Sequence, residues 1–421
     1  MAVGTNLGGK SPMPAAQNAG RRNQFHAVAA GFLGWTLDAF DFFVVVFLFD
    51  SLAAQFHVRK EDIIATVSWT LLMRPVGAVI FGLLTDRYGR RIPLIANVIF
   101  FSVVELLCGF APNYTVFFVL RILYGIGMGG EWGVGTSLVM EATSSRWRGV
   151  LSGILQNGYA VGYLLAAVAY RFAFPAWGWR PMFWLGGIPA LLAFYISAKV
   201  PESEAWQRHR APSTSAVLRA VGQQWKLCMY LLLLMTFMMF LSHGTQDLYP
   251  DFLQSHHAGV AVVSYIVILG NIGAMLGGII FGQLSNSVGR RLSLIAALAL
   301  SLAVIPLWAF GASLKALAVG AFLMQVGVQG AWGIIPAHLS ELSADATRGL
   351  VPGLAYQLGI VLAARTPVVE HNLSKRVGYS WALAGFEIFT IVILAIAVAF
   401  GPERRGRSFV EPAPIESPVS A

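Results

Sequence analysis

Long apolar segments recur along almost the whole chain and are separated by short polar connections. Each segment is close to the ~20 residues that a helix needs to cross a bilayer. A membrane barrel would show strands of about 10 alternating residues, whereas these segments are longer, continuous and rich in Leu, Ala, Gly and Phe. The pattern therefore predicts an all-α membrane protein with spanning helices at 25–50, 63–84, 92–111, 115–139, 150–171, 182–199, 227–250, 260–284, 292–311, 315–339, 350–368 and 380–400.

The same pattern divides the chain into two halves. The least apolar internal stretch, 201–226, lies between the sixth and seventh segments, and we predict that it is a cytoplasmic linker. It separates a six-helix bundle at 25–200 from a second one at 227–400. The flanking residues 1–24 and 401–421 are rich in small residues and proline, so we expect disordered cytoplasmic tails there.

Composition supports the bilayer as the solvent for most of the chain. The sequence is 57% hydrophobic and 12% charged, whereas soluble domains carry about 25% charged residues. The net charge of +9 would suggest nucleic-acid binding in a soluble domain, but here Lys and Arg gather in short connections, which is typical of cytoplasmic loops. We therefore expect a multi-pass protein of the cell inner membrane, with both termini cytoplasmic, contact with the lipid bilayer and no nucleic acid.

Other features argue against an enzyme. Cys108 and Cys228 lie inside apolar segments and form no evident disulfide or metal framework. The sequence has no nucleophile motif, no metal-ligand spacing and no phosphate-binding loop, because the glycines of the fourth segment lie within a membrane span. We therefore expect no enzyme activity, no metal and no cofactor.

The two halves repeat each other in sequence, with matching residues 200 positions apart (82 and 282, for example). Three separate motifs align in this way: 82–91 with 282–291, Glu141 with Glu341, and Arg148 with Arg348. One register held over three motifs indicates an internal duplication. Parallel repeats of six helices place a substrate between the halves near the bilayer midplane and allow alternating access.

The loop at 82–91 resembles the signature between the second and third helices of the major facilitator superfamily. The resemblance covers 25–400 and implies the major facilitator fold, with twelve transmembrane helices in two six-helix repeats. Glycine permits a tight turn, while the acid and the arginines can pair with each other, with a helix end or with Glu141. In the second copy Asn286 replaces the acid, so we expect a weaker latch. We assign a cytoplasmic gate to Gly82, Asp86, Arg87, Gly89, Arg90, Arg91, Glu141, Arg148, Gly282, Gly289, Arg290, Arg291, Glu341 and Arg348.

The first segment carries two acids, Asp38 and Asp41, which lie on nearly one helix face. Two carboxylates this close in a low dielectric repel each other, so at least one should hold a proton or lie beside a cation. Either acid could therefore carry a proton for coupled transport. The alternative is that one acid pairs with an arginine and holds helices together.

Basic residues inside apolar segments are costly and therefore point to function. Arg74 presents a planar fork of donors that fits a carboxylate, so it suits an organic-acid substrate. A permanent ion pair with Asp38 or Asp41 is the alternative. Arg121 leads a glycine-rich fourth segment of a kind common in the superfamily, in which Glu131 is a proton site or an ion-pair partner.

The seventh segment ends in a polar string, Ser242 to Tyr249, in which His243 and Asp247 are four residues apart and share a face. A histidine bonded to an acid can exchange protons near neutral pH. A helix end that meets water at the membrane surface is the alternative reading.

This string is similar to the seventh-helix signature of fungal lactate–proton permeases, in the sialate–proton symporter family. It matches that signature at Ser242, His243, Thr245, Gln246 and Asp247 and departs from it at Met239 and Asp251. The resemblance implies that His243, Gln246 and Asp247 act in substrate recognition and proton coupling. It also suggests Gln357, in the eleventh segment, as a polar substrate contact.

Together these features predict a proton-coupled symporter for a small monocarboxylate anion of the lactate and pyruvate class, working as a monomer. Arg74 would hold the carboxylate, Gln246 and Gln357 would bond its other oxygens, and Asp247 with His243 would carry the proton. The main alternative is symport of sialic acid, although its hydroxyls would need more polar partners than we expect at the midplane. A dicarboxylate or osmolyte symporter is the second alternative, and a sensor that binds solute without moving it is an alternative of another class.

Overall fold

The computed structural model describes residues 14–410, and regular secondary structure in this range is entirely helical. The outer parts of both predicted tails, 1–13 and 411–421, lie outside the described residues. Within the described range, ten helices are long and apolar enough to cross a membrane. The remaining two crossings are α5 (Tyr114–Ala142), and α17 (Val351–Ala363) with α18 (Thr366–Val377). The predicted all-helical architecture is therefore confirmed.

The N-terminal bundle holds the first six crossings. These are α1 (Pro14–Phe47), α3 (Lys60–Tyr88), α4 (Arg91–Cys108), α5, α6 (Arg148–Phe172), and α8 (Arg180–Leu185) with α9 (Pro189–Lys199). Short helices connect them or lie in the linker: α2 (Phe49–Phe56), α7 (Phe174–Trp177), α10 (Glu204–Arg208) and α11 (Thr214–Gln223).

The C-terminal bundle repeats this order. Its crossings are α12 (Trp225–Gln246) with α13 (Tyr249–Ser255), α14 (Val260–Val288), α15 (Arg290–Phe310), α16 (Leu314–Leu342), α17 with α18, and α19 (Tyr379–Phe400). A 3-10 turn, η1 (Asp345–Thr347), precedes α17.

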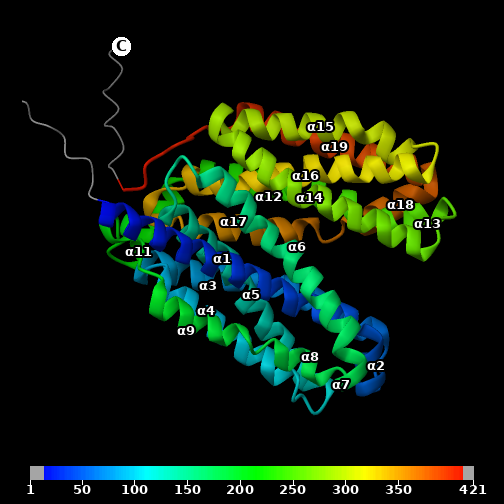
Figure 1. Cartoon of the computed structure of the whole chain (residues 1–421), viewed down its shortest axis with the longest axis horizontal. Helices are drawn as coiled ribbons and strands as arrows, with labels where there is room; N and C mark the ends of the chain where they lie inside the picture. The colour runs from blue at the N-terminus through cyan, green and yellow to red at the C-terminus, as the bar shows by residue number, and fades with distance from the viewer. Residues whose placement is uncertain (1–13, 411–421) are drawn as a thin grey trace, which may run out of the picture.

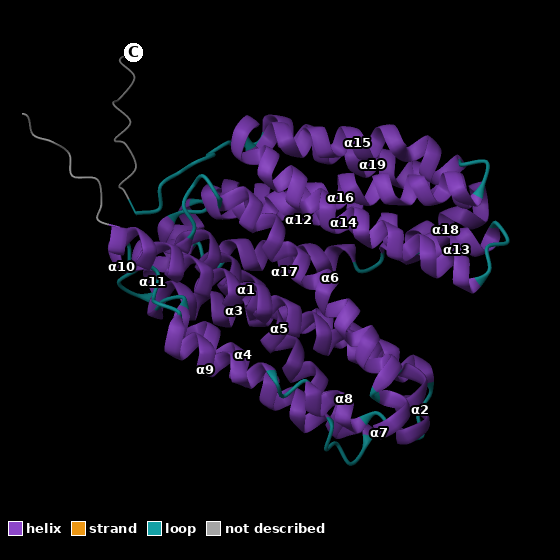
Figure 2. Cartoon of the chain, viewed as in Figure 1, coloured by secondary structure: helices purple, strands orange, loops and turns teal. Residues whose placement is uncertain are grey.

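The two bundles form a V (Figure 1). They come together at the end that carries α10, α11 and the outer limits of the described chain, which we call the gate end. They separate toward the opposite end, where α2 and α7 of one bundle face α13 and α18 of the other; we call this the open end (Figure 2). A site between the halves is therefore reached from the open end.

Glycines allow the bundles to touch where they meet. A Cβ atom on Gly153 of α6 would lie 2.7 Å from the carbonyl carbon of Gly278 on α14, and one on Gly133 of α5 would lie 2.9 Å from the Cα of Gly353 on α17. Real Cβ atoms do not approach backbone so closely, so these pairs fix the helix separation.

Three crossings predicted as continuous helices are broken. The second part of each begins at a proline in its first turn: Pro189 in α9, Pro250 in α13 and Pro367 in α18. Proline lacks a backbone N–H and clashes with the preceding turn, so it starts a new helix more readily than it continues one. The eleventh crossing consequently extends to Val377, beyond the predicted limit of 350–368.

The predicted tails are partly ordered, contrary to expectation. The first helix begins at Pro14, so residues 14–24 are helical. At the other terminus, residues 401–410 pack against the gate end, where the Phe409 ring is only 3% exposed. Both segments are too polar for a rule based on apolar patterns to detect.

We expect Gly153→Ala to loosen the gate end, because the added methyl group cannot fit against Gly278 unless α6 and α14 move apart. The variant should unfold at a lower temperature in detergent than the wild-type protein. Gly222→Ala is the matched control, because nothing lies within 4 Å of its Cβ position, and such a surface change alters stability by about 0.5 kcal/mol or less. Equal unfolding temperatures for Gly153→Ala and Gly222→Ala would contradict the close packing of α6 against α14.

Candidate transport site and gate

The gate of the N-terminal half is a buried network centred on Arg90. Its Nη1 lies 3.1 Å from Asp86, and its Nε and Nη2 lie 3.0 and 2.8 Å from Glu141. None of these three side chains is exposed to solvent. Gly89 precedes Arg90 with a φ of 105°, a conformation that favours glycine, and so turns the chain sharply into α4.

Each gate glutamate also binds an arginine of the opposite half. Arg348 Nη1 lies 2.9 Å from Glu141, and Arg148 Nη1 lies 2.9 Å from Glu341. From its own half, Glu341 accepts bonds of 2.9 and 3.0 Å from Arg290. Each half thus supplies an arginine that binds the glutamate of the other half, and these salt bridges close the gate end.

Asp86, the acid of the loop at 82–91, forms a further contact between the halves. Asp86 accepts hydrogen bonds from the backbone N–H groups of Gly349 (2.8 Å) and Leu350 (3.0 Å). Asn286 occupies the matching place and accepts from Gly149 N–H at 3.0 Å, while its amide donates to the Arg146 carbonyl. The second copy is neutral and forms one accepted and one donated backbone bond with the opposite half, whereas Asp86 accepts two.

The other predicted gate residues surround this network. Gly82 and Gly282 lie in close contact with the opposite bundle, at Leu350 and Gly149. Arg87 instead donates to the Ala211 carbonyl of the linker. Gly289 repeats the turn of Gly89, with a φ of 109°.

Sequence reasoning missed two glutamates of the gate. Glu202 accepts from the backbone N–H groups of Arg90 and Arg91, and Glu403 accepts from that of Arg291 at 2.8 Å. Both follow a proline, in the dipeptides 201–202 and 402–403. This repeated dipeptide after the sixth and twelfth crossings is the signal that could have identified them.

Residues beyond α19 complete the gate. The Phe409 ring lies 3.9 Å from the guanidinium carbons of both Arg148 and Arg348. Arg407 donates to the carbonyls of Glu341 and Ser343, and its own carbonyl accepts from Arg148. The segment expected to be a free tail therefore holds the two arginines that join the halves.

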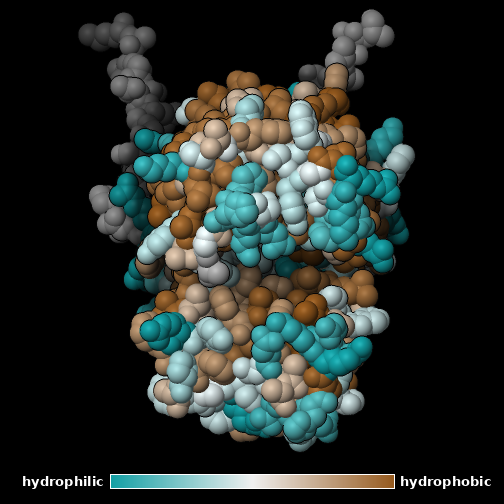
Figure 3. Space-filling model, turned by 90° about the vertical axis from the view of Figure 1, so that its right-hand side faces the viewer, coloured by the Kyte–Doolittle hydropathy of each residue, from teal (hydrophilic) through white to brown (hydrophobic). Residues whose placement is uncertain are grey.

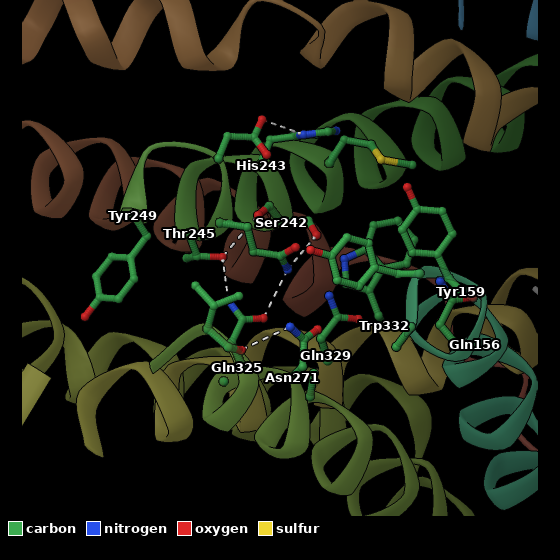
Figure 4. Close-up of a pocket in the computed structure, with 18 of the residues that line it drawn as sticks. Gln156, Tyr159, Ser242, His243, Thr245, Tyr249, Asn271, Gln325, Gln329 and Trp332 are labelled. Carbon is green, nitrogen blue, oxygen red and sulfur yellow. Dashed lines mark hydrogen bonds and ion pairs between the residues drawn. The ribbon is translucent and has the colours of Figure 1, made fainter. Parts of the chain in front are cut away.

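A cavity of about 470 Å³ lies between the halves. The face at the open end is hollowed between them (Figure 3), and polar side chains from α12, α14 and α16 project into the cavity (Figure 4). Its polar lining includes six amides: Gln156, Asn157, Gln246, Asn271, Gln325 and Gln329. The expectation that the midplane offers few polar partners was therefore wrong.

Arg74 lines this cavity from α3 and is only 3% exposed. Within residues 14–410 its Nε and Nη2 have no hydrogen-bond partner, and no acid forms a salt bridge with it. Its guanidinium lies 6.0 Å from the centre of the Tyr356 ring. Arg74 therefore forms no salt bridge with Asp38 or Asp41 in this conformation, although Asp38 lies within electrostatic reach of it.

Of the two glutamines predicted to contact substrate, one lines the cavity. Gln246 donates to Gln325 at 3.0 Å, and Gln325 donates in turn to Thr245 at 3.3 Å. Gln357 is fully buried away from the cavity lining and donates to the Gly129 carbonyl at 3.2 Å. It joins α17 to α5, and Gln325 occupies the polar position that we had expected for it.

His243 and Asp247 form the predicted pair at the cavity wall. Nδ1 of the histidine lies 2.9 Å from a carboxylate oxygen of the acid, and the two side chains are 36% and 34% exposed. Both side chains are therefore accessible from the cavity while they are bonded to each other.

The acids of the N-terminal half lie behind the cavity wall. Asp38 accepts from the Tyr124 hydroxyl at 3.3 Å, whereas Asp41 has no hydrogen-bond partner in the described chain. Arg121 pairs with Glu105 at 2.6 Å, an acid that sequence reasoning missed. Arg121 is thus the one arginine that forms a salt bridge with a described acid of this group, and its partner is Glu105 and not Asp38 or Asp41.

Two further charges of the apolar segments lie elsewhere. Glu131 is fully buried beside Gly34 of α1, and its oxygens lack partners among the described residues. Arg365 lies exposed at the break between α17 and α18, and it does not line the cavity.

Comparison with known proteins gives a consistent picture. The family model described as "Sugar (and other) transporter" matches residues 26–224 and 230–405. A carboxylic acid transporter protein homolog of Saccharomyces cerevisiae is 32% identical over 82% of this chain, which spans 61% of the yeast protein. A probable 4-methylmuconolactone transporter of Cupriavidus pinatubonensis is 30% identical over 94% of both chains. The sialic acid transporter NanX of Escherichia coli is 26% identical over 90% of this chain and 94% of its own.

A solved structure supports the fold. The proton:xylose symporter XylE superimposes with a TM-score of 0.76 over 92% of this chain and 98% of its own, at 19% sequence identity. At that identity the likeness concerns the fold alone.

We expect Glu341→Gln to open the gate end, because Arg148 and Arg290 would lose the carboxylate that they share. Removing one partner of a buried ion pair costs roughly 3–5 kcal/mol. Alkylation of a cysteine placed at Ser152, which is buried where the halves meet, would report the opening in a variant without Cys108 and Cys228. Glu204→Gln is the control, since its pair with Arg208 is exposed and worth about 0–1 kcal/mol. A cysteine that stays unreactive in Glu341→Gln would contradict this role.

Proposed function

Because the chain belongs to the sugar (and other) transporter family, we propose that it is a secondary transporter that moves a small monocarboxylate together with protons. The gate end faces the cytoplasm of a cell whose inner membrane it spans, and the open end faces outward. The substrate enters the cavity as an anion, the halves rock about their glycine contacts, and the cavity opens at the gate end. The chain works as a monomer.

One observation carries this proposal: Arg74 lies at the cavity without a salt bridge, and its Nε and Nη2 have no hydrogen-bond partner among the described residues. A buried guanidinium without a partner is costly, and a bidentate carboxylate supplies both charge and two acceptors in the right geometry. The amides of Gln246 and Gln325 lie at the same cavity and can bond a hydroxyl or keto oxygen beside the carboxylate. An acid of the lactate and pyruvate class has this pattern.

A second candidate substrate is a larger unsaturated or aromatic carboxylic acid. The cavity of about 470 Å³ leaves room for more than a three-carbon acid, and its wall includes the rings of Tyr159, Trp332 and Tyr356. Aromatic walls stack on flat apolar groups. The names of similar proteins support a carboxylate in general, because they include transporters of carboxylic acids, 4-methylmuconolactone, niacin, cis,cis-muconate and gentisate.

Proton coupling is supported by the pair at the wall. His243 and Asp247 contact the cavity that holds the anion, so a proton on the pair and a negative charge at Arg74 enter together. Crossing the membrane with both sites neutralised avoids moving bare charge through a low dielectric. Asp38, Asp41 and Glu131 lie behind the wall as further proton carriers.

We expect Arg74→Lys to weaken lactate binding by about 10- to 100-fold, because lysine keeps the charge but loses the bidentate fork. Initial uptake rates of radiolabelled lactate, pyruvate, benzoate, succinate and sialic acid into proteoliposomes would measure the change and rank the substrates. Arg376→Lys, at an exposed site on α18, should match the wild-type protein. Wild-type affinity in Arg74→Lys would exclude Arg74 as the carboxylate ligand, and binding without uptake in the wild-type protein would indicate a sensor.

We expect Asp247→Asn to lose lactate accumulation driven by a pH gradient while it keeps exchange of internal for external lactate. The amide mimics the protonated acid, so the loaded carrier can still reorient, but no proton is carried with it. His243→Ala should instead shift the pH dependence of uptake, because the acid loses its bonded partner. Gradient-driven uptake measured beside counterflow separates these effects. If Asp247→Asn still accumulated lactate under the pH gradient, another acid would have to carry the coupled proton.

A further inference from the structure

A second pair of buried acids lies in the C-terminal half, outside the site described above. Glu370 is on α18 and Glu387 is on α19, and both residues are fully buried. None of their four carboxylate oxygens has a hydrogen-bond partner within the described part of the chain. The hydroxyl of Thr390, one turn after Glu387, is likewise unpartnered there.

The pair lies directly behind the cavity wall. Helices α12, α18 and α19 pack against one another, and the carboxyl group of Glu387 occupies the space where a side chain on Gly244 of α12 would lie. Gly244 directly follows His243, whose side chain lines the cavity. A glycine at this position lets an acid of α19 reach the backbone of the helix that carries the His243–Asp247 pair.

The acids form a series that leads inward from the cavity. Asp247 is one-third exposed in the cavity wall and lies within electrostatic reach of Glu370. Glu370 in turn lies within electrostatic reach of Glu387. The exposed end of this series contacts cavity water, and its inner end is closed off from solvent.

Positive charge around the pair is scarce. No salt bridge of the described residues involves Glu370 or Glu387. The charged groups on the packed elements are Lys226 and His243 on α12, with Asp247 directly after it, and exposed His371, Lys375 and Arg376 on α18. Cys228 and Tyr230 on α12 and Tyr379 on α19 are the other titratable groups of these helices. Arg290 and Arg291 on α15 bind Glu341 and the carbonyl of Val398 at the gate end, and Lys226 lies in the first turn of α12, 17 residues before His243. Val398 lies eleven residues after Glu387 on the same helix, a separation of roughly 16 Å.

We propose that Glu370 and Glu387 form a second proton-binding site of the carrier, loaded from the cavity through His243 and Asp247. Two bare carboxylates in a low dielectric repel each other and lack a compensating cation, so the pair takes up protons when the cavity is open. The inference rests on the proposed proton coupling and adds to it a place where protons are held away from the substrate.

A proton fits this site better than a metal ion. Within residues 14–410 no group of three or more His, Cys, Asp or Glu side chains is arranged to hold a metal. Hard cations need six or more oxygen ligands, whereas a proton needs one carboxylate oxygen.

Infrared difference spectroscopy of the purified, full-length protein tests the site without reference to transport. Protonated carboxylic acids have a carbonyl stretching band that carboxylates and amides lack. Acidifying the wild-type protein should produce bands of buried protonated acids, and Glu387→Gln and Glu370→Gln should each remove one. Asp251→Asn, an exposed acid on α13 of the same half, should leave those bands unchanged. Unaltered bands in both glutamine variants would overturn the proposal.

Transport measurements connect the site to coupling. With an imposed gradient of one pH unit, loss of one coupled proton lowers the limiting accumulation of lactate about tenfold. We expect this loss in Glu387→Gln, with counterflow within about twofold of wild type, and recovery in Glu387→Asp, which keeps a proton site. Recovery in Glu387→Asp also shows that the position tolerates substitution. Full accumulation by Glu387→Gln, or a requirement for sodium that this variant removes, would overturn the proposal.

These outcomes distinguish a failure of the second proton-binding site from a failure of the proposed proton-coupled symport. If the wild-type protein fails to accumulate any tested acid under the gradient, the proposed symport fails, whereas the infrared bands still decide whether the pair binds protons. If the wild-type protein accumulates lactate and the glutamine variants do so equally, symport stands and the second site fails.

Discussion

Two reciprocal salt bridges between the halves, each from an arginine of one half to a glutamate of the other, are the interaction on which the rest of the structure depends. Arg348 reaches Glu141 and Arg148 reaches Glu341, and each glutamate also holds an arginine of its own half. Burying charges this deeply is costly unless each has a partner, and each charge of this network has one. The network therefore closes one end of the molecule, and closure of that end determines that the cavity opens at the other.

A contrast between paired and unpaired charge runs through the molecule. At the gate end each buried acid of the network is bound by arginine, so charge there serves to hold the bundles together. Between the two ends the balance is different, because Arg74, Glu131, Glu370 and Glu387 form no salt bridge among the described residues. Such groups are costly to bury, and the proposed symport would supply their partners as an anion and protons that arrive and leave.

Much of the fold and of the gate could be predicted from the sequence because the second half of the chain repeats the first. The register between the halves identified the gate, and the spacing of His243 and Asp247 on one helical turn correctly predicted their hydrogen bond. Contacts between distant segments were harder to foresee. Gln357 was expected at the substrate and instead bonds to Gly129, and Glu105 was overlooked because nothing local marks its pairing with Arg121. A polar side chain on a membrane-spanning helix can face either the cavity or a neighbouring helix, and only tertiary packing decides between the two.

The position of Phe409 has a consequence for how the protein is made. Its ring covers both arginines that join the halves, and it follows the last of the twelve crossings in the chain. The ribosome therefore adds it only after the sequence of every spanning helix has been translated. During synthesis the two bundles enter the bilayer with this part of their lock missing, so the fully closed arrangement of the gate end is a property of the finished protein and not of the nascent chain.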